Sequence, residues 1–360
     1  MKIIHTADIH LGSSFSNLSK EERKQRNLDV LNTFNRLVEY AKQNGVNTIM
    51  LAGDIFDTKE RQFARLQDKK AFEDIVANNH NINFLYLKGN HDNMKSEGEK
   101  PDNLLTFNDK EWTRYDFGNV TIAGIEFGAD SDSSIYESLS LDSERFNIVM
   151  MHGQNTLVKD SRRELKESIN LHALQNRNID YLALGHIHSY QQGEIDKRGV
   201  WAYSGCLMGR GFDEAGDKGF ILIDTDAKTI DFVPFAEHKV IIKSIDISDA
   251  TNAQAAWGIV SDALNDISNK QNHMLKVELT GEITFDPVNE RLTETINNRI
   301  IGFFFHKVDD KTRRKYSFSE FIGQNSLPGE FVSVVMSDDS LDDDTKNKIM
   351  NLGLSLILNN

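Results

Sequence analysis

The chain has 360 residues, 39% of them hydrophobic and 27% charged, a composition typical of a globular protein with a substantial core. Its formal net charge of −14 speaks against a function that relies on a basic surface, and no apolar run approaches the roughly 20 residues of a membrane span. The first residues lack the features of a signal peptide and Cys206 is the single cysteine, so we expect a cytoplasmic protein without disulfides.

Strand and helix patterns alternate in the first part of the chain. Ser19 and Glu22 form a capping-box pattern that opens the first helix. This order of strand, helix, strand, helix and strand predicts an α/β layered domain. The strand-like runs cover residues 2–6, 46–52 and 84–87, and the helical stretches cover about 19–43 and 62–78.

From residue 120 onward, short strand-like runs follow one another. We predict that they form a second sheet facing the first, which gives a four-layer α/β/β/α sandwich. These runs cover residues 120–125, 146–151, 181–184, 200–203, 220–224 and 230–233.

A break at residues 234–238 separates a smaller C-terminal part. Its pattern is strand (240–247), helix (252–267), strand (274–279), helix (288–298) and an apolar run (300–305), with a last helix at 343–358. We therefore predict a catalytic domain at residues 1–237, an α/β capping domain at 238–335, and an acidic segment with a C-terminal helix at 336–360.

Short motifs rich in Asp, Asn and His follow the strand-like runs, where an α/β fold gathers its ligand-binding loops. They supply oxygen and imidazole nitrogen rather than sulfur, which suits Mn²⁺, Mg²⁺, Fe²⁺ or Zn²⁺. In the D-x-H and H-x-H motifs, alternation along an extended backbone would place both side chains on one side. The motifs are Asp8-Ile9-His10, Gly53-Asp54-Ile55-Phe56-Asp57, Gly89-Asn90-His91-Asp92, Met151-His152-Gly153 and Gly185-His186-Ile187-His188.

Each motif by itself has an ordinary structural explanation. Asp8 and Asp54 could cap helices, Asn90 could be a turn residue, and His152 could be a core histidine. All the motifs together, each after an apolar strand, favour a metal site over chance.

This set of motifs resembles the calcineurin-like metallophosphoesterases, whose pattern is D-x-H, G-D-x-x-D, G-N-H-D, H and G-H-x-H. The resemblance covers roughly residues 1–235. Within that superfamily the chain is similar to the SbcD-type DNA exonucleases and their bacterial YhaO-like relatives. The narrower similarity depends on GDIFD, ALGHIHSY at residues 183–190, and SGCLMGRGFDEAGDKGF at residues 204–220.

The resemblance implies two divalent cations, with Mn²⁺ the first expectation and Mg²⁺, Fe²⁺ or Zn²⁺ as alternatives. His91 would assist the leaving oxygen and Asp57 would orient His91. Archaeal and eukaryotic members carry His at the position of Asp57, so this residue favours the bacterial branch. Arg210 either contacts a substrate phosphate or pairs with Asp213 or Glu214. The implied ligands are Asp8, His10, Asp54 and His188 for the first cation, and Asp54, Asn90, His152 and His186 for the second.

Three functions fit these residues: a metal-dependent DNA exonuclease or endonuclease in DNA repair, a phosphodiesterase or phosphatase acting on small nucleotides, and a non-catalytic scaffold. The complete motif set disfavours the scaffold, and Thr58-Lys59 and Asp92 disfavour a protein serine/threonine phosphatase. The C-terminal part favours the nuclease. The resemblance then implies DNA and an SbcC-like ATPase as partners, and a homodimer as a further expectation. The last helix either docks that ATPase or packs on its own domain, and the basic run at 311–315 either contacts DNA or is a solvated face.

Overall fold

The computed structural model describes residues 1–15, 18–58, 66–92, 100–126, 133–155 and 168–358. The chain divides into two compact units, Met1–Lys239 and Val240–Asn360. The roles assigned from the sequence to residues 1–237, 238–335 and 336–360 stay predictions. Over the described ranges, no helix combines the length and the apolar character that a membrane crossing requires.

The first unit contains two six-stranded sheets. In the first sheet, β1, β2, β3 and β4 run parallel, and β13 and β14 are added antiparallel beside β1. Its order is β14 (Thr229–Pro234), β13 (Gly219–Asp224), β1 (Lys2–Thr6), β2 (Thr48–Ala52), β3 (Asn83–Leu87) and β4 (Leu104–Thr106). The order in the second sheet is β11 (Gln191–Glu194), β12 (Val200–Tyr203), β10 (Tyr181–Gly185), β7 (Phe146–His152), β6 (Val120–Gly124) and β5 (Thr113–Phe117).

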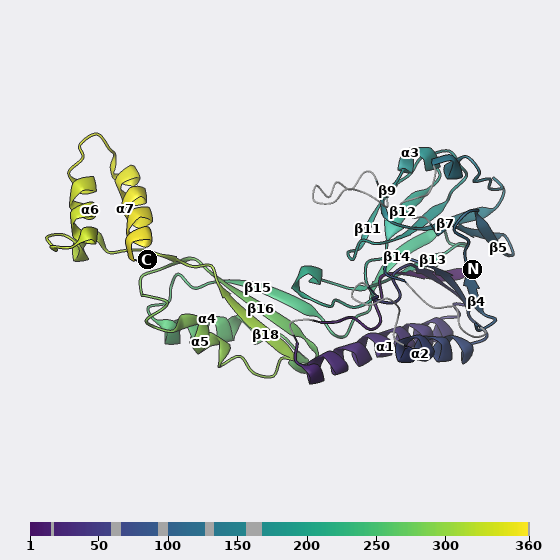
Figure 1. Ribbon diagram of the computed structural model, residues 1–360, viewed down its shortest axis with the longest axis horizontal. Helices are drawn as coiled ribbons and strands as arrows, with labels where there is room; N and C mark the ends of the chain where they lie inside the picture. Colours follow the sequence, from purple (N-terminus) through teal and green to yellow (C-terminus); the bar gives the residue numbers. More distant parts are fainter. Residues whose placement is uncertain (16–17, 59–65, 93–99, 127–132, 156–167, 359–360) are drawn as a thin grey trace. The chain divides into compact units, whose positions relative to one another are not determined.

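The two sheets bury their facing sides against each other, and helices cover their outer sides (Figure 1). Between the sheets, Met50 and Leu85 of the first sheet belong to one apolar cluster with Ile148 and Met150 of the second. Helices α1 (Lys20–Gln43) and α2 (Leu66–Ala77) lie outside the first sheet, and α3 (Leu171–Leu174) packs outside the second. This confirms the predicted four-layer α/β/β/α sandwich.

One detail of the predicted layers is wrong. The runs at 220–224 and 230–233 were expected in the second sheet, but β13 pairs with β1, with Lys2 opposite Asp224. An alternating apolar pattern shows that a strand is half-buried but does not identify its partner, so this assignment depends on tertiary contacts. Strands β4, β5 and β11 were also not predicted; the last two are edge strands with a mixed polar composition.

The helix α1 begins where the capping box predicted. The Ser19 hydroxyl accepts from the Glu22 amide, and the Glu22 carboxylate accepts from the Ser19 amide. Phe34, on its buried face, stacks on Phe72 of α2 and contacts Phe84 of β3. Burial of each such side chain contributes about 1.5–3 kcal/mol. The helix expected from residue 62 is described from Leu66, and residues 62–65 lie outside the described chain.

The second unit has a parallel three-stranded sheet of β15 (Val240–Asp246), β16 (Met274–Thr280) and β18 (Phe305–Asp310). Helices α4 (Ala253–Ala263) and α5 (Leu292–Asn297) pack on it through an apolar cluster that includes Val260, Leu275 and Leu292. The third strand begins at Phe305, at the end of the apolar run at 300–305. Its residue Ile300 instead belongs to the cluster under the helices.

A helical hairpin ends the described chain. Helix α6 (Leu327–Met336), which was not predicted, packs on α7 (Asp343–Leu358), which was predicted with these bounds. Val332 and Val335 of α6 contact the same cluster as Met350 and Leu354 of α7. The remaining short elements are β8 (Gln154–Asn155), β9 (Ser168–Ile169), β17 (Glu282–Ile283), β19 (Arg313–Arg314), and the 3₁₀ turns η1 (Ser133–Tyr136), η2 (Phe212–Glu214), η3 (Lys270–Asn272) and η4 (Phe318–Glu320).

Candidate metal centre

The polar motifs lie at the carboxyl ends of neighbouring parallel strands in both sheets. In the first sheet, the loops after β1, β2 and β3 carry the first three motifs. In the second sheet, His152 ends β7, and the last motif follows its neighbour β10. The two sheets therefore bring together side chains that are as much as 180 residues apart, from Asp8 to His188.

Backbone hydrogen bonds hold the loops after β1 and β2 side by side. The amides of Asp8 and His10 donate to the carbonyls of Gly53 and Asp54, at 3.0 and 2.9 Å. The φ angles of Asp8, His10 and Asp54 are 51°, 52° and 54°, and that of His186 is 106°. The D-x-H segment is thus not extended, and the alternation argument for it was wrong. A positive φ angle is unfavourable for residues other than glycine, and residues with this conformation are often found at functional sites.

Glycines in the motifs allow this close approach of backbone and ligands. A Cβ on Gly89 would lie 2.2 Å from Asp54 Oδ1, and a Cβ on Gly185 would lie 1.9 Å from the Ala52 carbonyl oxygen. Both distances are far below van der Waals contact. Any larger residue at these positions would displace a side chain or strand end of the site.

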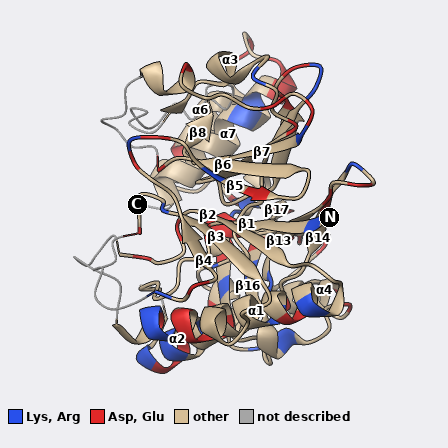
Figure 2. Cartoon of the chain, turned by 90° about the vertical axis from the view of Figure 1, so that its right-hand side faces the viewer, with Lys and Arg blue, Asp and Glu red and all other residues tan. Residues whose placement is uncertain are grey.

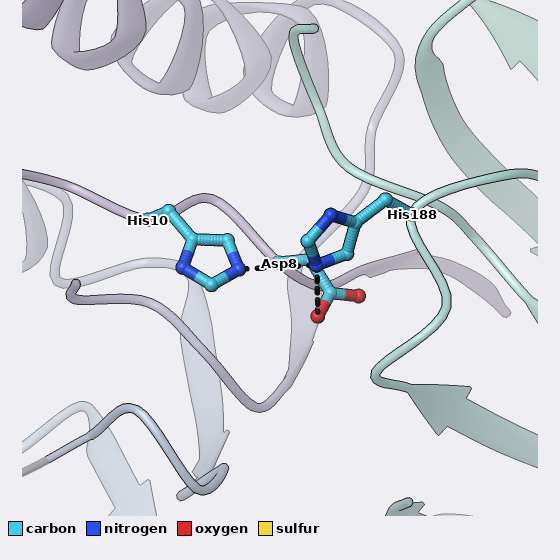
Figure 3. Close-up of side chains that lie close together, drawn as sticks. All are labelled: Asp8, His10 and His188. Carbon is cyan, nitrogen blue, oxygen red and sulfur yellow. Dashed lines mark hydrogen bonds and ion pairs between the residues drawn. The ribbon is translucent and has the colours of Figure 1, made fainter. Parts of the chain in front are cut away.

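One group of side chains able to hold a cation consists of Asp8, His10 and His188 (Figure 3). The Nε2 atoms of His10 and His188 face each other at 3.2 Å, and His188 Nε2 lies 3.7 Å from Asp8 Oδ1. The side chains of Asp8 and His10 are buried. The ligand atoms of the group therefore converge on one point, which two buried side chains and the partly exposed His188 surround.

A second such group consists of Asp8, Asp54 and His152. Asp54 Oδ2 lies 3.4 Å from His152 Nε2 and 3.8 Å from His10 Nε2, so this carboxylate lies between the two groups. Asn90 Oδ1 is 3.2 Å from His152 Nε2. The His186 ring meets the His152 ring edge to face at 5.4 Å, and the His186 amide donates to Asp8.

Burial and neighbouring charges shift the protonation of these groups. Burial raises the pKa of Asp8 and lowers the pKa of His10, which keeps the His10 imidazole neutral. Burial opposes ionisation of Asp54 too, but His152 lowers its pKa below the usual range. The same pair raises the pKa of His152 to about 10, although burial alone would lower it. Buried carboxylates and imidazoles that share a proton in this way match the donor set of a divalent metal site.

His91 and Asp57 lie beside the first group. His91 Nδ1 is 3.3 Å from Asp57 Oδ1, and the His91 ring contacts the His10 ring edge to face at 5.0 Å. Although burial opposes it, the hydrogen bond from His91 holds the pKa of Asp57 below its ordinary value. The His91 amide also donates to Asp54 Oδ1 at 2.8 Å. The structure therefore brings together the two side chains that the resemblance implied as a catalytic pair.

Arg210 forms the ion pair that was one of the two sequence alternatives, with Glu214 as the partner. The Arg210 Nη2 atom donates to Glu214 Oε1 at 2.6 Å, and its amide donates to Glu214 Oε2 at 2.7 Å. Arg210 Nη1 also lies 3.7 Å from Asp57 Oδ2. No ion pair of Arg210 with Asp213 occurs among the described residues.

Two further buried carboxylates belong to the site. Glu214 Oε1 accepts from His188 Nδ1 at 2.6 Å, which leaves Nε2 of that ring available to a cation. Asp92 accepts from the amides of Phe56 and Gly89 at 2.8 and 2.9 Å, and so connects the loops after β2 and β3. Burial is the main cause that raises the pKa of Asp92 to about 7. The sequence did not predict that Glu214 and Asp92 support the site. The one indication was that each lies inside a motif, at residues 204–220 and 89–92.

Comparison with known proteins agrees with this geometry. Residues 1–190 match the calcineurin-like phosphoesterase family. The chain is 28% identical over 288 residues to the uncharacterized metallophosphoesterase YhaO of Bacillus subtilis, covering 75% of this chain and 69% of that protein. It is 25% identical over 305 residues to the DNA double-strand break repair protein Mre11 of Sulfolobus acidocaldarius, covering 79% and 76%. It is 24% identical over 265 residues to a subunit of the SbcCD nuclease of Staphylococcus epidermidis, covering 63% and 66%.

The family match spans more than half of the chain and contains most of the motifs. The sandwich fold positions those motifs at one edge of the two sheets, where carboxylates and imidazoles of the described residues form three groups able to hold a cation; the third consists of His10, Asp57 and His91. The chain therefore belongs to the calcineurin-like phosphoesterase family and is a metal-dependent phosphoesterase.

Proposed function

We propose that this chain is a DNA nuclease that hydrolyses phosphodiester bonds with two divalent cations and acts in DNA repair. The observation that carries the proposal is the convergence of acidic and imidazole side chains from both sheets on two adjacent points. The names of two relatives, a double-strand break repair protein and a nuclease subunit, support DNA as the substrate.

The proposed ligands are those that the resemblance implies; they keep Asp8 with the first group and add Asn90 and His186 to the second. Asp8, His10 and His188 hold the first cation, and Asn90, His152 and His186 hold the second. Asp54 bridges them, in keeping with the position of its Oδ2 between His10 and His152. When bound, a cation pair of this kind, with Mn²⁺ as our first choice, activates a water and stabilises charge on the phosphoryl oxygens.

The proton chemistry of the leaving group falls to His91 in this proposal. His91 delivers a proton to the leaving oxygen, and Asp57, 3.3 Å from its Nδ1 atom, fixes the orientation of the ring. The Asp57 carboxylate is held ionised in the absence of metal because its pKa is lowered by this contact, against the effect of burial. It therefore offers an acceptor that fixes the His91 ring through its Nδ1 atom.

The second unit favours DNA over a small nucleotide as the substrate. A chain of 121 residues, Val240–Asn360, with its own core follows the metal centre. We assign to it the placement of DNA. The net charge of −14 favours the alternative, a phosphodiesterase for small nucleotides using the same centre. The charge is not of one sign everywhere along the chain, however; on α2, basic and acidic residues are interspersed (Figure 2).

The helical hairpin is the proposed docking surface for an SbcC-like ATPase. One side of α7 packs on α6 through Met350 and Leu354, whereas Leu352 is 64% exposed. Val334 of α6 is likewise 67% exposed. An apolar surface of this kind on a hairpin suits a partner helix. We leave homodimerisation as an expectation from the resemblance.

The basic run at 311–315 has a smaller place in the proposal. Lys311 pairs with Glu278 at 2.7 Å, and Arg314 pairs with Asp286 at 2.8 Å. These pairs neutralise part of the positive charge. We therefore do not assign the run a main role in DNA binding.

The test is Mn²⁺-dependent degradation of end-labelled single- and double-stranded DNA, run beside a generic phosphodiester substrate, with His91→Ala as the control. We expect the chain to degrade DNA and the variant to lose that activity. Hydrolysis of the generic substrate without any cleavage of DNA, also in the presence of the ATPase, would favour the small-nucleotide phosphodiesterase instead.

A further inference from the structure

We propose that Glu214 and Arg210 act together as a positioning pair that connects the metal ligand His188 to the catalytic pair His91 and Asp57. The proposal rests on the proposed ligand role of His188. It assigns Arg210 a structural task inside the centre in place of a contact with substrate phosphate.

Glu214 fixes the His188 ring from the side opposite the cation. Its Oε1 atom accepts from His188 Nδ1 at 2.6 Å, while Nε2 of the same ring faces His10 and Asp8. The Glu214 side chain is 5% exposed, so water does not replace this contact easily. An imidazole that donates from Nδ1 keeps its Nε2 lone pair for the metal, and the carboxylate makes that nitrogen more basic.

Arg210 holds the Glu214 carboxylate in place. The amide of Arg210 donates to Oε2 at 2.7 Å, and Nη2 donates to Oε1 at 2.6 Å, so both carboxylate oxygens are engaged by one residue. The guanidinium compensates the negative charge that burial of Glu214 would otherwise make costly. The η2 turn, which spans Phe212–Glu214, sets this i to i+4 spacing.

The other side of the Arg210 guanidinium reaches the catalytic pair, Asp57 and His91. Arg210 Nη1 is 3.3 Å from the Ser13 hydroxyl and 3.7 Å from Asp57 Oδ2. Ser13 itself donates to Asp57 Oδ2 at 3.0 Å, and Asp57 Oδ1 faces His91. A continuous polar chain thus runs from His188 through Glu214, Arg210 and Asp57 to His91. The Arg210 side chain is 17% exposed and surrounded by these acceptors, which leaves it poorly suited to bind an incoming phosphate.

The experiment measures Mn²⁺ binding without any nucleic acid, by calorimetry and electron paramagnetic resonance, for Glu214→Gln, Arg210→Met and the double variant. A glutamine keeps the shape but presents an amide group to the donors of Arg210. We expect each single variant to weaken one of the two Mn²⁺ equivalents by roughly 10–100-fold, the usual effect of removing a partner of a metal-bound histidine. The double variant should bind Mn²⁺ no more weakly than the weaker-binding single variant, because both changes disrupt the same hydrogen-bonded pair. We also expect the imidazole nitrogen coupling in the Mn²⁺ spectrum to decrease in Glu214→Gln.

The matched control is Asp213→Asn, which removes the same charge from the exposed neighbouring residue and should bind Mn²⁺ as the unmodified chain does. Thermal unfolding in the presence of a chelator shows whether a variant is folded. If Arg210→Met does not fold, Arg210→Lys provides a second variant that keeps the charge. Unchanged Mn²⁺ affinity in folded Glu214→Gln, or additive losses in the double variant, would overturn the proposal. So would an Arg210→Met variant that raises only the KM for DNA. A chain that binds no Mn²⁺ at all would instead contradict the proposed metal centre.

Discussion

Strained backbone accompanies the chemistry at the level of single residues. Asp8, His10, Asp54 and His186 all have positive φ angles, and each such conformation costs on the order of 1–3 kcal/mol. The cost is offset locally by hydrogen bonds such as those from the Asp8 and His10 amides to the loop after β2. These bonds hold the carboxylates and imidazoles close together before any cation binds, which is what a preorganised site requires.

The first prediction concerns His91. Replacing His91 by Ala should leave metal binding unchanged, because the contact of residue 91 with Asp54 is made by its backbone amide. Turnover should fall about 10²–10⁴-fold, the usual contribution of a positioned proton donor. Single-turnover rates and Mn²⁺ titrations of the same preparation measure both effects. Full activity of the variant would remove His91 from the mechanism.

The second prediction concerns Asp54, whose Oδ2 atom lies near His10 and His152. The Asp54→Asn variant should bind both cations more weakly, by more than the roughly 10–100-fold typical of residues outside the ligand set. Metal analysis after dialysis gives the stoichiometry. Asp57→Asn is the matched control, since Asp57 is proposed to contact His91 rather than a cation. If Asp54→Asn lost only one of the two metal equivalents, the bridging role would be excluded.

The third prediction is a pH dependence that follows from His152. In the metal-free protein, the Asp54 carboxylate overcomes burial and raises the pKa of His152 to about 10. This pair stabilises the metal-free fold most at pH values between the ordinary pKa of an aspartate and that of a histidine. Its contribution decreases at lower pH, where the pKa of Asp54 is depressed in the fold, and it is lost as the pH rises through about 10. A cation needs the neutral ring, so binding at pH 7.5 should release about one proton and tighten with increasing pH. Calorimetry in buffers of different ionisation enthalpy measures the release; buffer-independent heats would contradict it.

At the level of elements, the site depends on how closely the ends of strands from the two sheets approach. Gly185 ends β10 in one sheet, and a Cβ there would lie 1.9 Å from the Ala52 carbonyl oxygen of β2 in the other. It would also lie 2.8 Å from His152 Nδ1. The sheets can meet at this point because the residue has no side chain.

The fourth prediction compares two Gly→Ala changes. Gly185→Ala should destabilise the first unit by about 1–3 kcal/mol or more and weaken metal binding, because backbone and His152 must both move. Gly258→Ala in α4, where a Cβ has no neighbour within 4 Å, should be neutral or stabilise by up to about 1 kcal/mol. Denaturant unfolding with and without Mn²⁺ distinguishes the two. Equal behaviour of both variants would show that the strand ends are not tightly constrained.

At the level of the whole molecule, the proposed ligands all belong to the first unit, Met1–Lys239, which has apolar clusters of its own between and outside its sheets. The second unit, from Val240, has a separate cluster under α4 and α5. Metal chemistry and the proposed placement of DNA are therefore assigned to different units.

The fifth prediction separates these roles. A fragment of residues 1–239 should bind two cations and hydrolyse a generic phosphodiester at a rate similar to that of the full chain, because it contains every proposed ligand. Degradation of DNA should fall strongly, since the proposed positioning unit is missing. Comparison of both substrates with the full chain measures the two roles. DNA degradation at the full rate would show that the second unit has no part in it.

The sequence by itself determined the fold class and the chemical character of the centre. Capping at Ser19, apolar runs of strand length and the polar residues that follow them are local features, and local features are readable along a chain. The types of the motif residues then indicated a divalent-metal site, and their resemblance to the calcineurin-like family implied a phosphoesterase before any contact was known. Their individual ligand roles stay predictions.

Tertiary structure decided the rest. It placed β13 beside β1, gave Asp8 and His10 their positive φ angles, and turned Glu214 towards His188 and Arg210. Each of these depends on a partner that is distant in sequence, such as Gly53 for the Asp8 amide or His188 for Glu214, 26 residues away. Periodicity and motif spacing carry no information about such partners, because a side chain's packing and hydrogen bonds are fixed only when the sheets come together.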